Sequence, residues 1–492
     1  MNVILIYPKY PDTFWSFKHV LKFISKKAAF PPLGLLTVAA ILPKEWNKKL
    51  VDINVENLTD DHIAWADMVF ISAMIVQQES AQEIINRCKS FGKTVVAGGP
   101  AFTAQAEKFS GVDHFVLNEA EITLPLFLND LQEGMPMPVY TSTKRPDITK
   151  TPIPLWSLIN FKDYVTMAVQ YSRGCPFNCE FCDIIILNGR IPRVKREKRF
   201  INEIQSLYNA GWRGSIFIVD DNFIGNKTQV KKMLALLIEW QKKLNYPFKF
   251  FTEASVNMAD DEELMQLMSK ANFYKVFIGI ETPHIDSLQE CGKTQNIATN
   301  LIEAVKTIQL NGMQVMAGFI VGFDNDPPNI FDAQIKFIRE VGVVTAMVGL
   351  LNALPGTRLW HRLQAESRLV GDTKGENTDG SLNFIPKMGE YRLREGYKKI
   401  LSEIYSYKQY YRRIDKFIKN YKPTVKVKIT TLDGAKAFVK SIFKIGFSRA
   451  GLLYWKLIFK TSFTKIRALP EAVELAIMGL HFKKIADKIT KA

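Results

Sequence analysis

The chain has 492 residues, of which 47% are hydrophobic and 23% are charged, a composition that excludes a disordered or fibrous protein. The formal net charge is +16, but residues 391–492 hold 24 Lys+Arg against 7 Asp+Glu, while the first 390 residues hold 41 against 42. A basic C-terminal segment therefore follows a nearly neutral body, so the total charge does not indicate a nucleic-acid-binding protein. The length suggests about three domains.

The five cysteines exclude a disulfide-rich scaffold. The opening MNVILIYPKY lacks the basic and long apolar regions of a signal peptide, and no run of 18 apolar residues occurs in the chain. We therefore expect a cytoplasmic protein in a reducing compartment.

Residues 1–135 alternate apolar runs with helical patterns, which is typical of an α/β domain with a doubly wound (Rossmann-like) parallel sheet. The predicted strands are 3–7, 49–55, 68–72, 94–98 and 114–117, and the predicted helices are 33–42, 79–91 and 120–131. Ligands of such sheets bind beyond the carboxyl ends of the strands, at a topological switch point. No GxGxxG or P-loop is present, so a dinucleotide or ATP site is not indicated.

Residues 136–164 contain five prolines and are predicted to form a linker. In residues 165–385 the alternation resumes, with strands predicted at 166–172, 215–220, 248–253, 275–281, 315–322 and 344–351. Helices are predicted between them at 199–210, 228–243, 260–271, 296–311 and 330–341. Six repeats fall short of the eight of a full barrel, so we expect a partial (β/α)6 barrel with its reactive groups at the strand carboxyl ends. Residues 386–492 are predicted to be a basic, mostly helical region.

Three cysteines, Cys175, Cys179 and Cys182, form a CxxxCxxC pattern just after the first predicted barrel strand. Three thiolates on one loop can hold a zinc ion or an iron–sulfur cluster. A closed zinc site needs a fourth ligand, whereas Cys88 and Cys291 are remote in sequence and no His lies within sixty residues of the loop. Three ligands suit a [4Fe–4S] cluster that leaves one iron open to a small molecule.

The segment YSRGCPFNCEFCD resembles the cluster loop of the radical S-adenosylmethionine (SAM) superfamily. The resemblance implies that the three cysteines hold a [4Fe–4S] cluster, that SAM chelates the open iron, and that reductive cleavage of SAM gives a radical that abstracts hydrogen. It implies further SAM contacts in the loop and at the strand ends, from Phe181, Asp220, Asp221, Asn222, Glu253, Ser255, Gly279 and Glu281. A strand-end carboxylate has a second interpretation, since it could instead cap a helix or pair with a lysine.

An α/β domain before such a barrel resembles the class that binds cobalamin in its first domain. The segments that carry this resemblance are 30–43, 71–80, 97–100 and 117–121. It implies that the corrin lies over the strand ends and faces the barrel. The candidate cobalamin contacts are Ser72, Ala73, Met74, Ile75, Gly98, Gly99, Pro100, Glu119 and Glu121.

Two departures from that class are visible. The Asp-x-His-x-x-Gly motif of methionine-synthase-type domains is absent, so we expect cobalt to bind with no protein histidine below it, and His62 to be a surface residue that opens a helix. Asn118 stands where glycine is more usual. The alternative is a first domain that only packs on the barrel.

Over residues 1–385 the chain resembles cobalamin-dependent radical SAM proteins related to the hopanoid C-2 methylase, as in YPKYPDTFWSFKHVLKF and NALPGTRLWHRLQAESRL. The resemblance implies a C-methyltransferase for an unactivated carbon of a hydrophobic substrate, with a polycyclic lipid as the best candidate and an external electron donor. Methylcobalamin would deliver the methyl group, and a second SAM would restore it. The first alternative is a radical cyclase or rearrangement enzyme, similar to the anaerobic magnesium-protoporphyrin cyclase. The second is a non-catalytic, metal-stabilised protein that binds lipid or nucleic acid.

The segment 437–463 places Lys or Arg among Phe, Ile, Leu, Trp and Tyr. It has three interpretations: a helical cap with its aliphatic side facing the barrel, a surface that contacts anionic lipid, or a single-stranded nucleic-acid site. The interleaved aliphatic residues favour lipid over nucleic acid. In the lipid case the enzyme would lie at the inner face of the membrane.

Overall fold

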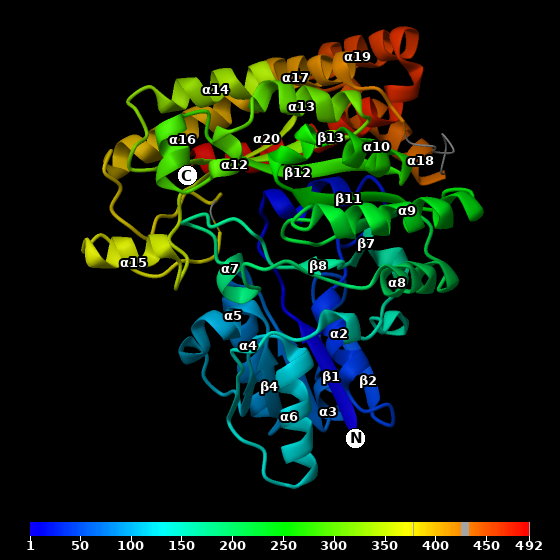
Figure 1. Ribbon diagram of the computed structural model, residues 1–492, viewed down its shortest axis with the longest axis vertical. Coiled ribbons are helices and arrows are strands. Elements are labelled where there is room, and N and C mark those ends of the chain that lie inside the picture. Colours follow the sequence, from blue (N-terminus) through cyan, green and yellow to red (C-terminus); the bar gives the residue numbers. More distant parts are fainter. Residues whose placement is uncertain (377, 425–431, 492) are drawn as a thin grey trace.

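The structure, a computed structural model, describes residues 1–376, 378–424 and 432–491. It contains two six-stranded parallel sheets, one in the N-terminal part and one in the central part, and a C-terminal group of helices (Figure 1). The first domain lies at one end of the molecule and the last helices lie at the other (Figure 1). The expected α/β class is therefore confirmed.

The first sheet contains the five strands predicted from the apolar runs and a sixth, short one. Its order is β2-β1-β3-β4-β5-β6, with every pair parallel. The order changes direction between β1 and β3, so the topological switch point lies between their carboxyl ends. The strands are β1 (Asn2–Tyr7), β2 (Asn47–Asp52), β3 (Met68–Ser72), β4 (Thr94–Gly98), β5 (His114–Val116) and β6 (Val139–Tyr140).

The helices of the first domain pack on the two faces of this sheet. In α4 the buried residues Ala81, Ile84, Ile85 and Cys88 recur at helical spacing, so they form one apolar stripe against the sheet. Cys88 is therefore a core residue. The helices are α2 (Leu33–Ile41), α3 (Asp60–Trp65), α4 (Gln78–Ser90), α5 (Pro100–Gln105) and α6 (Ala120–Gln132).

The proline-rich segment between the two sheets is mostly irregular, but it is not a free tether. It supplies β6, which pairs with β5. It also contains three short 3-10 turns at Ile148–Lys150, Trp156–Leu158 and Phe161–Asp163. Trp156 is buried, and its indole N–H donates to Ser206 Oγ at 3.0 Å.

The second sheet has the order β14-β13-β12-β11-β10-β7, again with every pair parallel. Among the described strands no pairing joins β7 to β14, so the barrel is open, as expected from six repeats. The strands are β7 (Thr166–Val169), β10 (Ser215–Ile218), β11 (Lys249–Ala254), β12 (Phe273–Glu281), β13 (Gln314–Val321) and β14 (Thr345–Leu350).

Five helices cover the outer face of this sheet. Trp240 of α9 stacks on Phe248, which in turn contacts Phe250 of β11, so Phe250 faces the helices. Because side chains alternate along a strand, Phe251 and Glu253 face the inside of the barrel. The helices are α8 (Glu197–Asn209), α9 (Lys227–Lys243), α10 (Glu262–Lys270), α13 (Leu301–Leu310) and α14 (Ile330–Val341).

The C-terminal region packs on the β14 edge of the barrel. Two helices follow residue 389 in place of one continuous helix, because Ser406 caps the second by accepting from Gln409 N. The hydroxyls of Tyr397 and Tyr405 donate to carbonyls of β14. The elements are α15 (Arg358–Ala365), α16 (Glu390–Ile404), α17 (Tyr407–Asn420), α18 (Leu432–Ser441), the π-helical turn η8 (Ile442–Gly446), α19 (Gly451–Thr464) and α20 (Leu469–Lys491).

The last helix also packs on the start of the chain. Phe14 contacts the rings of Tyr405 and Phe482, and the His481 ring hydrogen-bonds Phe14 O at 3.1 Å. Lys275 of β12 forms an ion pair with Glu474 of α20. Helix α20 therefore ties the barrel to the N-terminal segment.

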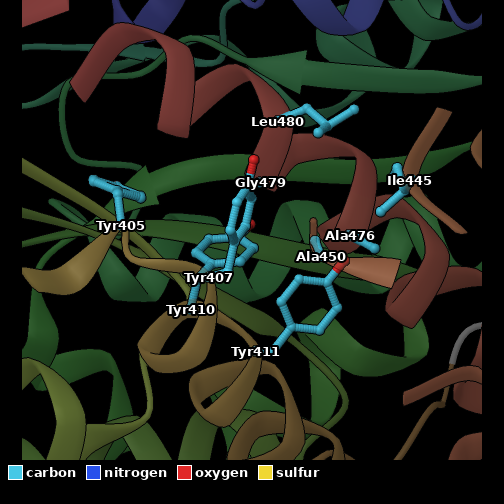
Figure 2. A pocket seen from close by; sticks show the side chains of 9 residues that line it. All are labelled: Tyr405, Tyr407, Tyr410, Tyr411, Ile445, Ala450, Ala476, Gly479 and Leu480. Atoms are coloured by element: carbon cyan, nitrogen blue, oxygen red, sulfur yellow. The ribbon is translucent and has the colours of Figure 1, made fainter. Parts of the chain in front are cut away.

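A small cavity lies among α17, α20 and η8 (Figure 2). Its volume is about 10 Å³, which is room for one water molecule and too little for a substrate. The Tyr411 hydroxyl finds no hydrogen-bond partner among the described residues. The cavity is lined by Tyr405, Tyr407, Tyr410, Tyr411, Ile445, Ala450, Ala476, Gly479 and Leu480.

The contact between α14 and α16 gives a test of this packing. A Cβ at Gly396 would lie 2.2–2.3 Å from the ring of Phe331. We expect Gly396→Ala to lower the free energy of unfolding by roughly 1–3 kcal/mol, because the ring has to move. The measurement is thermal unfolding followed by circular dichroism.

The matched control is Gly34→Ala in α2, where nothing lies within 4 Å of the new Cβ. This variant should gain about 0.5–1 kcal/mol, because alanine favours a helix interior. Equal melting temperatures for Gly396→Ala and the wild type would contradict the α14–α16 packing.

Candidate functional site

The three clustered cysteines lie on a loop, residues 174–192, that follows β7 at the carboxyl edge of the barrel sheet. The loop begins and ends in an antiparallel ribbon of β8 (Ser172–Arg173) and β9 (Arg193–Val194), and it contains the short helix α7 (Ile184–Leu187). Gly174 has a φ of 97°, and a Cβ there would lie 2.8–3.1 Å from three carbonyl oxygens of residues 188–191. Glycine is therefore needed for the loop to close on itself.

The thiols of Cys175, Cys179 and Cys182 are half-buried. Burial raises the pKa of each, and the neighbouring thiols Cys179 and Cys175 raise that of Cys182 further, so the three sulfurs lie near one another. Within the described part of the chain, no three His, Cys, Asp or Glu side chains converge on the position of a single ion. The three thiols on one loop are the ligand set that the sequence predicts for an iron–sulfur cluster.

Asp220 binds the backbone just before the cysteine loop. It is completely buried, and its carboxylate accepts the backbone N–H groups of Tyr171 and Ser172 at 2.7 Å each. Burial raises the pKa of Asp220 to about 7. Its oxygens are directed at the backbone just before the loop, so it holds the loop in place and presents no exposed oxygen to a ligand.

Asp221 and Asn222 lie closer to the thiols. Asp221 accepts a hydrogen bond from Asn188 Nδ2 at 3.0 Å, across the loop. Asn222 Nδ2 lies 3.8 Å from Cys175 Sγ, and Asn222 Oδ1 accepts from Ser255 N at 3.2 Å. Asn222 therefore connects the ends of β10 and β11 with the first cysteine.

Glu253 is the unpaired carboxylate of the barrel interior. Its half-buried side chain makes no hydrogen bond or ion pair with any described residue. Burial raises its pKa to about 8, and the charge of Asp221 adds to the effect. An unpaired, desolvated carboxylate is able to accept hydrogen bonds from a ligand inside the barrel.

Glu281, at the end of β12, is paired instead. It forms a buried ion pair with Lys293. A Cβ at Gly279 would lie 2.4 Å from this carboxylate and 2.5 Å from the Lys293 ammonium, so the glycine leaves room for the pair. Lys293 also lies near the loop. Its positive charge therefore partly offsets the effect of burial on the pKa of Cys179.

Helix α15 holds the far side of the loop. Arg362 donates to both carboxylate oxygens of Glu180, at 2.8 and 3.1 Å, and to Asp324 at 2.7 Å. Although burial alone would raise the pKa of Asp324, Arg368 and Arg362 lower it to about 2. The neighbouring Phe181 is half-buried, with its ring centroid 6.3 Å from that of Phe323.

In the first domain, the structure brings most predicted cobalamin contacts to the switch-point edge. Ser72 ends β3 and residues 73–75 follow it, while Gly98 ends β4 and is followed by Gly99 and Pro100. Gly99 has a φ of 91°, and a Cβ there would lie 2.5 Å from Ser72 Oγ, so the two turns pack directly on each other. Met74 is 41% exposed, whereas Ile75 is covered in part by the chain at Gly375.

Glu119 and Glu121 lie on the same side of the domain but point at arginines. Arg173 donates to Glu119 and to Glu121 at 2.7 Å each, and Arg193 donates to Glu119 at 2.8 Å. Although burial alone would raise it, the hydrogen bond from Arg173 lowers the pKa of Glu121. These carboxylates join the first domain to the ribbon of the cysteine loop.

The backbone geometry bears on two residues of this domain, His62 and Asn118. His62 lies in the first turn of α3, where its backbone N–H donates to Thr59 Oγ1, so it opens a helix as expected. Asn118 has a φ of 63°, the left-handed conformation that glycine adopts most easily and asparagine tolerates. Asparagine can therefore replace glycine there.

Several residues of the site have no local signal in the sequence. Gln77 joins the turns after β1 and β3, because it donates to Pro8 O at 2.5 Å and accepts from Met74 N at 2.9 Å. Cys291 is remote in sequence, yet its backbone carbonyl accepts from Glu180 N at 2.8 Å. The Cys291 thiol points at Leu288 O of its own helix, 3.5 Å away.

A hollow of about 330 Å³ lies on the outer side of the cysteine loop. Two exposed arginines bind the loop there: Arg190 donates to Pro176 O at 3.3 Å and Arg358 donates to Asn178 O at 3.0 Å. Neither arginine has a carboxylate partner among the described residues. The hollow is lined by Pro176, Phe177, Asn178, Arg190, Gly292, Thr294 and Arg358.

Comparison with known proteins agrees with this geometry. Family models match a B12 binding domain at residues 24–128, the radical SAM superfamily at residues 169–338 and a domain of unknown function (DUF4070) at residues 357–492. Among solved structures, the fold is similar to the cobalamin-dependent SAM radical enzyme OxsB with aqua-cobalamin bound (TM-score 0.64, 15% identity, 100% of this chain and 80% of that one). It is also similar to the methyltransferase TsrM from Kitasatospora setae with cobalamin and a [4Fe–4S] cluster bound (TM-score 0.60, 13% identity, 97% and 99%).

One relative by sequence is named a methyltransferase and another a methylase. An uncharacterized methyltransferase of Synechocystis is 44% identical over 455 residues, which are 91% of this chain and 85% of that protein. The hopanoid C-2 methylase of Rhodopseudomonas palustris is 37% identical over 389 residues, 78% of this chain and 73% of that protein. These matches confirm the resemblance seen in the sequence. The chain belongs to the cobalamin-dependent radical SAM methyltransferase family, whose cofactors are a [4Fe–4S] cluster, SAM and cobalamin.

Proposed function

We propose that this enzyme transfers a methyl group to an unactivated carbon of a hydrophobic small molecule, with a polycyclic lipid of the hopanoid type as substrate. The observation that carries the proposal is the position of the three-cysteine loop. It lies between the inside of the barrel and the strand ends of the first domain, to which Arg173 joins it through Glu119 and Glu121. The 37% identity with the hopanoid C-2 methylase supports the lipid substrate.

We assign Cys175, Cys179 and Cys182 to the cluster, which when bound supplies the electron for SAM cleavage. Asn222 orients the Cys175 thiol through its amide. Glu253, unpaired at the end of β11, accepts hydrogen bonds from SAM, with Asp221 and Ser255 beside it. Asp220 holds the loop by its backbone. Phe181 packs beside the adenine, and Gly279 leaves space for Glu281 to fix Lys293 near the thiols.

The turns Ser72–Ile75 and Gly98–Pro100 form the surface that we assign to the corrin, which when bound supplies the methyl group. Gln77 keeps this surface in place because it connects the turns after β1 and β3. The close approach at Gly99 makes the two turns one continuous backbone surface. These turns contain no histidine. That the cobalt binds without a histidine of this chain stays part of the proposal.

The inner face of the barrel sheet supports a hydrophobic substrate. Phe217 and Phe251 stack there with centroids 4.7 Å apart, and Phe30 of the first domain contacts both. Trp15, which is 42% exposed, contacts the half-buried Phe277 at 5.1 Å. Partly exposed aromatic side chains on a concave face are typical of sites that bind apolar ligands.

An external electron donor is also part of the proposal. The hollow beside residues 176–178 of the loop carries the exposed cations Arg190 and Arg358. Unpaired arginines attract an acidic partner and speed its encounter with the surface. We place the docking of an acidic redox protein at this hollow.

We also propose that the C-terminal region contacts the surface of an anionic membrane. No helix among the described residues is long and apolar enough to cross a bilayer. Residues 434–470 contain eight Lys+Arg and no Asp or Glu. Seven large apolar side chains of the same stretch are more than half exposed, namely Val439, Phe443, Phe447, Leu452, Phe459, Phe463 and Ile466.

The geometry of η8 and α19 supports this contact. Leu452, Lys456, Phe459 and Phe463 recur at helical spacing and share one face of α19. The Trp455 indole donates to Gly446 O, so η8 packs beside that helix. Helix α19 lies at the end of the molecule away from the first domain (Figure 1). An apolar face rimmed by cations is typical of proteins that bind anionic lipid surfaces.

The cysteines give the first test of this function. After anaerobic reconstitution with iron, sulfide, SAM, cobalamin and a reductant, the wild type should bind iron and corrin and form 5′-deoxyadenosine. Each of Cys175→Ala, Cys179→Ala and Cys182→Ala should lose most of the iron and form no 5′-deoxyadenosine, because three thiolates hold the cluster.

The matched controls are Cys88→Ala and Cys291→Ala, both buried cysteines outside the proposed ligand set. They should keep the iron content of the wild type. A colourless wild-type protein that binds zinc would contradict the proposal. A product without an added methyl mass, found in lipid extracts of an expressing host, would indicate a cyclase.

The raised pKa of Glu253 gives a pH-dependent test. Burial raises this pKa from 4.5 to about 8, so the charged form is less stable in the folded chain than in the unfolded one. The penalty is absent below pH 4.5, grows as the pH rises toward 8 and is complete above it. Glu253→Gln should therefore raise the melting temperature of the cofactor-free protein by roughly 2 °C or more at pH 8.5 and leave it unchanged at pH 4.5.

Glu133→Gln, an exposed glutamate of the first domain, is the control and should show no such difference between the two pH values. Because Glu253 is assigned to SAM, its variant should also weaken SAM binding by about tenfold. A stability gain that is equal at both pH values would mean that the carboxylate is solvated or paired.

Vesicle sedimentation tests the membrane surface. The wild type should bind vesicles that contain phosphatidylglycerol and bind pure phosphatidylcholine much more weakly. Reversing Arg449 and Lys456 to Glu should weaken binding to the anionic vesicles by about 25-fold or more, since each cation near the surface contributes about 1 kcal/mol. Phe447→Ser with Phe463→Ser should weaken binding to both vesicle types.

The control carries the same change of net charge outside the C-terminal helices, with Lys44→Glu in the first domain and Lys144→Glu in the proline-rich segment, both exposed. It should bind as the wild type does. Equal affinity of the wild type for charged and neutral vesicles, or no binding at all, would leave the C-terminal helices as a cap only.

A further inference from the structure

An ion network connects the first domain with the cysteine loop. Two of its members, Glu119 and Glu121, begin helix α6. Arg173 donates to Glu119 Oε2 at 2.7 Å and to both oxygens of Glu121 at 2.7 and 3.0 Å. Arg193 donates to both oxygens of Glu119, at 2.8 and 3.1 Å. The network thus joins residues 52 to 74 positions apart in the chain.

The two carboxylates are already fully used by these contacts. Their side chains are 8% and 13% exposed. Glu121 Oε1 accepts a further hydrogen bond from Thr151 Oγ1 at 2.8 Å. A carboxylate that accepts charge-assisted hydrogen bonds at both oxygens has little capacity left for the amide groups of a corrin.

The arginines hold the loop at both ends and at its helix. Arg173 and Arg193 face each other in the β8–β9 ribbon that closes the loop. Arg145 donates to the carbonyl oxygens of Ile186 and Leu187 in α7, and lies 3.5 Å from Glu119. The β8–β9 ribbon and α7 are therefore both tied to the start of α6.

The burial of these charges favours one position of the cysteine loop over others. Arg173 is 14% exposed and Arg193 is 19% exposed, so both guanidinium groups have lost most of their water. Removal of Glu119 leaves Arg193 without a carboxylate partner, and removal of Glu121 leaves Arg173 with only one. The loss of a partner by a desolvated cation is far more costly than the loss of a surface ion pair. A shifted loop would carry the same cost, so the loop is held in one position.

We propose that Glu119 and Glu121 are positioning residues: through Arg173 and Arg193 they fix the cysteine loop on the first domain and thereby set the position of the cluster relative to the corrin. They do not bind the corrin themselves. This inference rests on the proposed cluster and corrin sites.

The test uses reconstituted holoenzyme with Glu119→Gln and Glu121→Gln, kept anaerobic. Hydrogen exchange followed by mass spectrometry should show peptides of residues 174–193 exchanging at least tenfold faster than in the wild type. Peptides of α9 and α13 should be unchanged. Cobalamin affinity should stay within twofold of the wild type, because the carboxylates do not touch the corrin.

A spectroscopic signature separates positioning from general stability. Electron paramagnetic resonance of the reduced cluster together with cob(II)alamin reports their magnetic coupling, which depends on their separation. The wild type should give one coupling, and both variants should give a broadened distribution. Arg173→Lys, which keeps the charge, should restore part of the wild-type signal relative to Arg173→Met.

Glu474→Gln is the matched control, since it breaks an ion pair with Lys275 far from the loop. It should change neither exchange nor coupling. If the Gln variants do not fold, Thr151→Val removes only one hydrogen bond to Glu121 and should shift the same two readouts in the same direction.

Three results would overturn the inference. A tenfold loss of cobalamin affinity with normal loop exchange would make the carboxylates corrin ligands. Unchanged exchange and coupling in all variants would make the network irrelevant to the loop. A change in Glu474→Gln equal to that in the two variants would reduce the effect to global stability. Failure of the wild type to bind iron or corrin would instead contradict the proposed function, and is visible before any variant is compared.

Discussion

The ion pair between Arg173 and the carboxylates of Glu119 and Glu121 is the contact on which the arrangement of the site depends. Each parallel sheet presents its reactive turns at the carboxyl ends of its strands, so a two-sheet enzyme needs those two edges to face each other. Apolar packing resists separation of two domains but is tolerant of sliding. Buried charges with fixed hydrogen-bond geometry resist sliding as well, because any displacement leaves a charge without its partner. The network therefore sets the register between the two edges.

The cysteine loop is held from more than one side, and this explains how a loop with so little regular structure can present three thiols. Arg362 of α15 binds Glu180 between the second and third cysteines, and Asp220 binds the backbone before the first. Asn222 approaches the Cys175 thiol itself. Each support comes from a different part of the chain, so the loop is stable only in the complete fold. A site built this way needs no rigid element of its own.

Local patterns predicted most of the strands and the cysteine loop, because periodicity and short spacings are written in consecutive residues. They could not predict partners. Glu281 pairs with Lys293 twelve residues away, and nothing in that interval marks the lysine. Glu253 was predicted to contact SAM as well, yet its side chain makes no ion pair or hydrogen bond with a described residue. Both glutamates lie at the carboxyl ends of barrel strands. Both were predicted to contact SAM for the same reason, and only their three-dimensional surroundings distinguish a structural ion pair from a group open to a ligand.

The positive charge of the C-terminal region is a second case in which the sequence did not reveal which side chains have partners. Two of its interpretations concern different helices, because α16 and α17 cap the β14 edge with buried tyrosines while α19 turns Leu452 and Phe463 outward. Lys460 pairs with Asp415, and Lys465 donates to backbone carbonyls at the end of α17, so these cations serve the cap. Lys436, Arg449, Lys456 and Arg467 remain exposed without carboxylate partners among the described residues. The net charge of the sequence does not distinguish the cations that bind within the cap from those that are exposed. The exposed set lies in the same short stretch as the exposed phenylalanines, and that coincidence, more than the total of +16, is the basis of the proposed contact with anionic lipid.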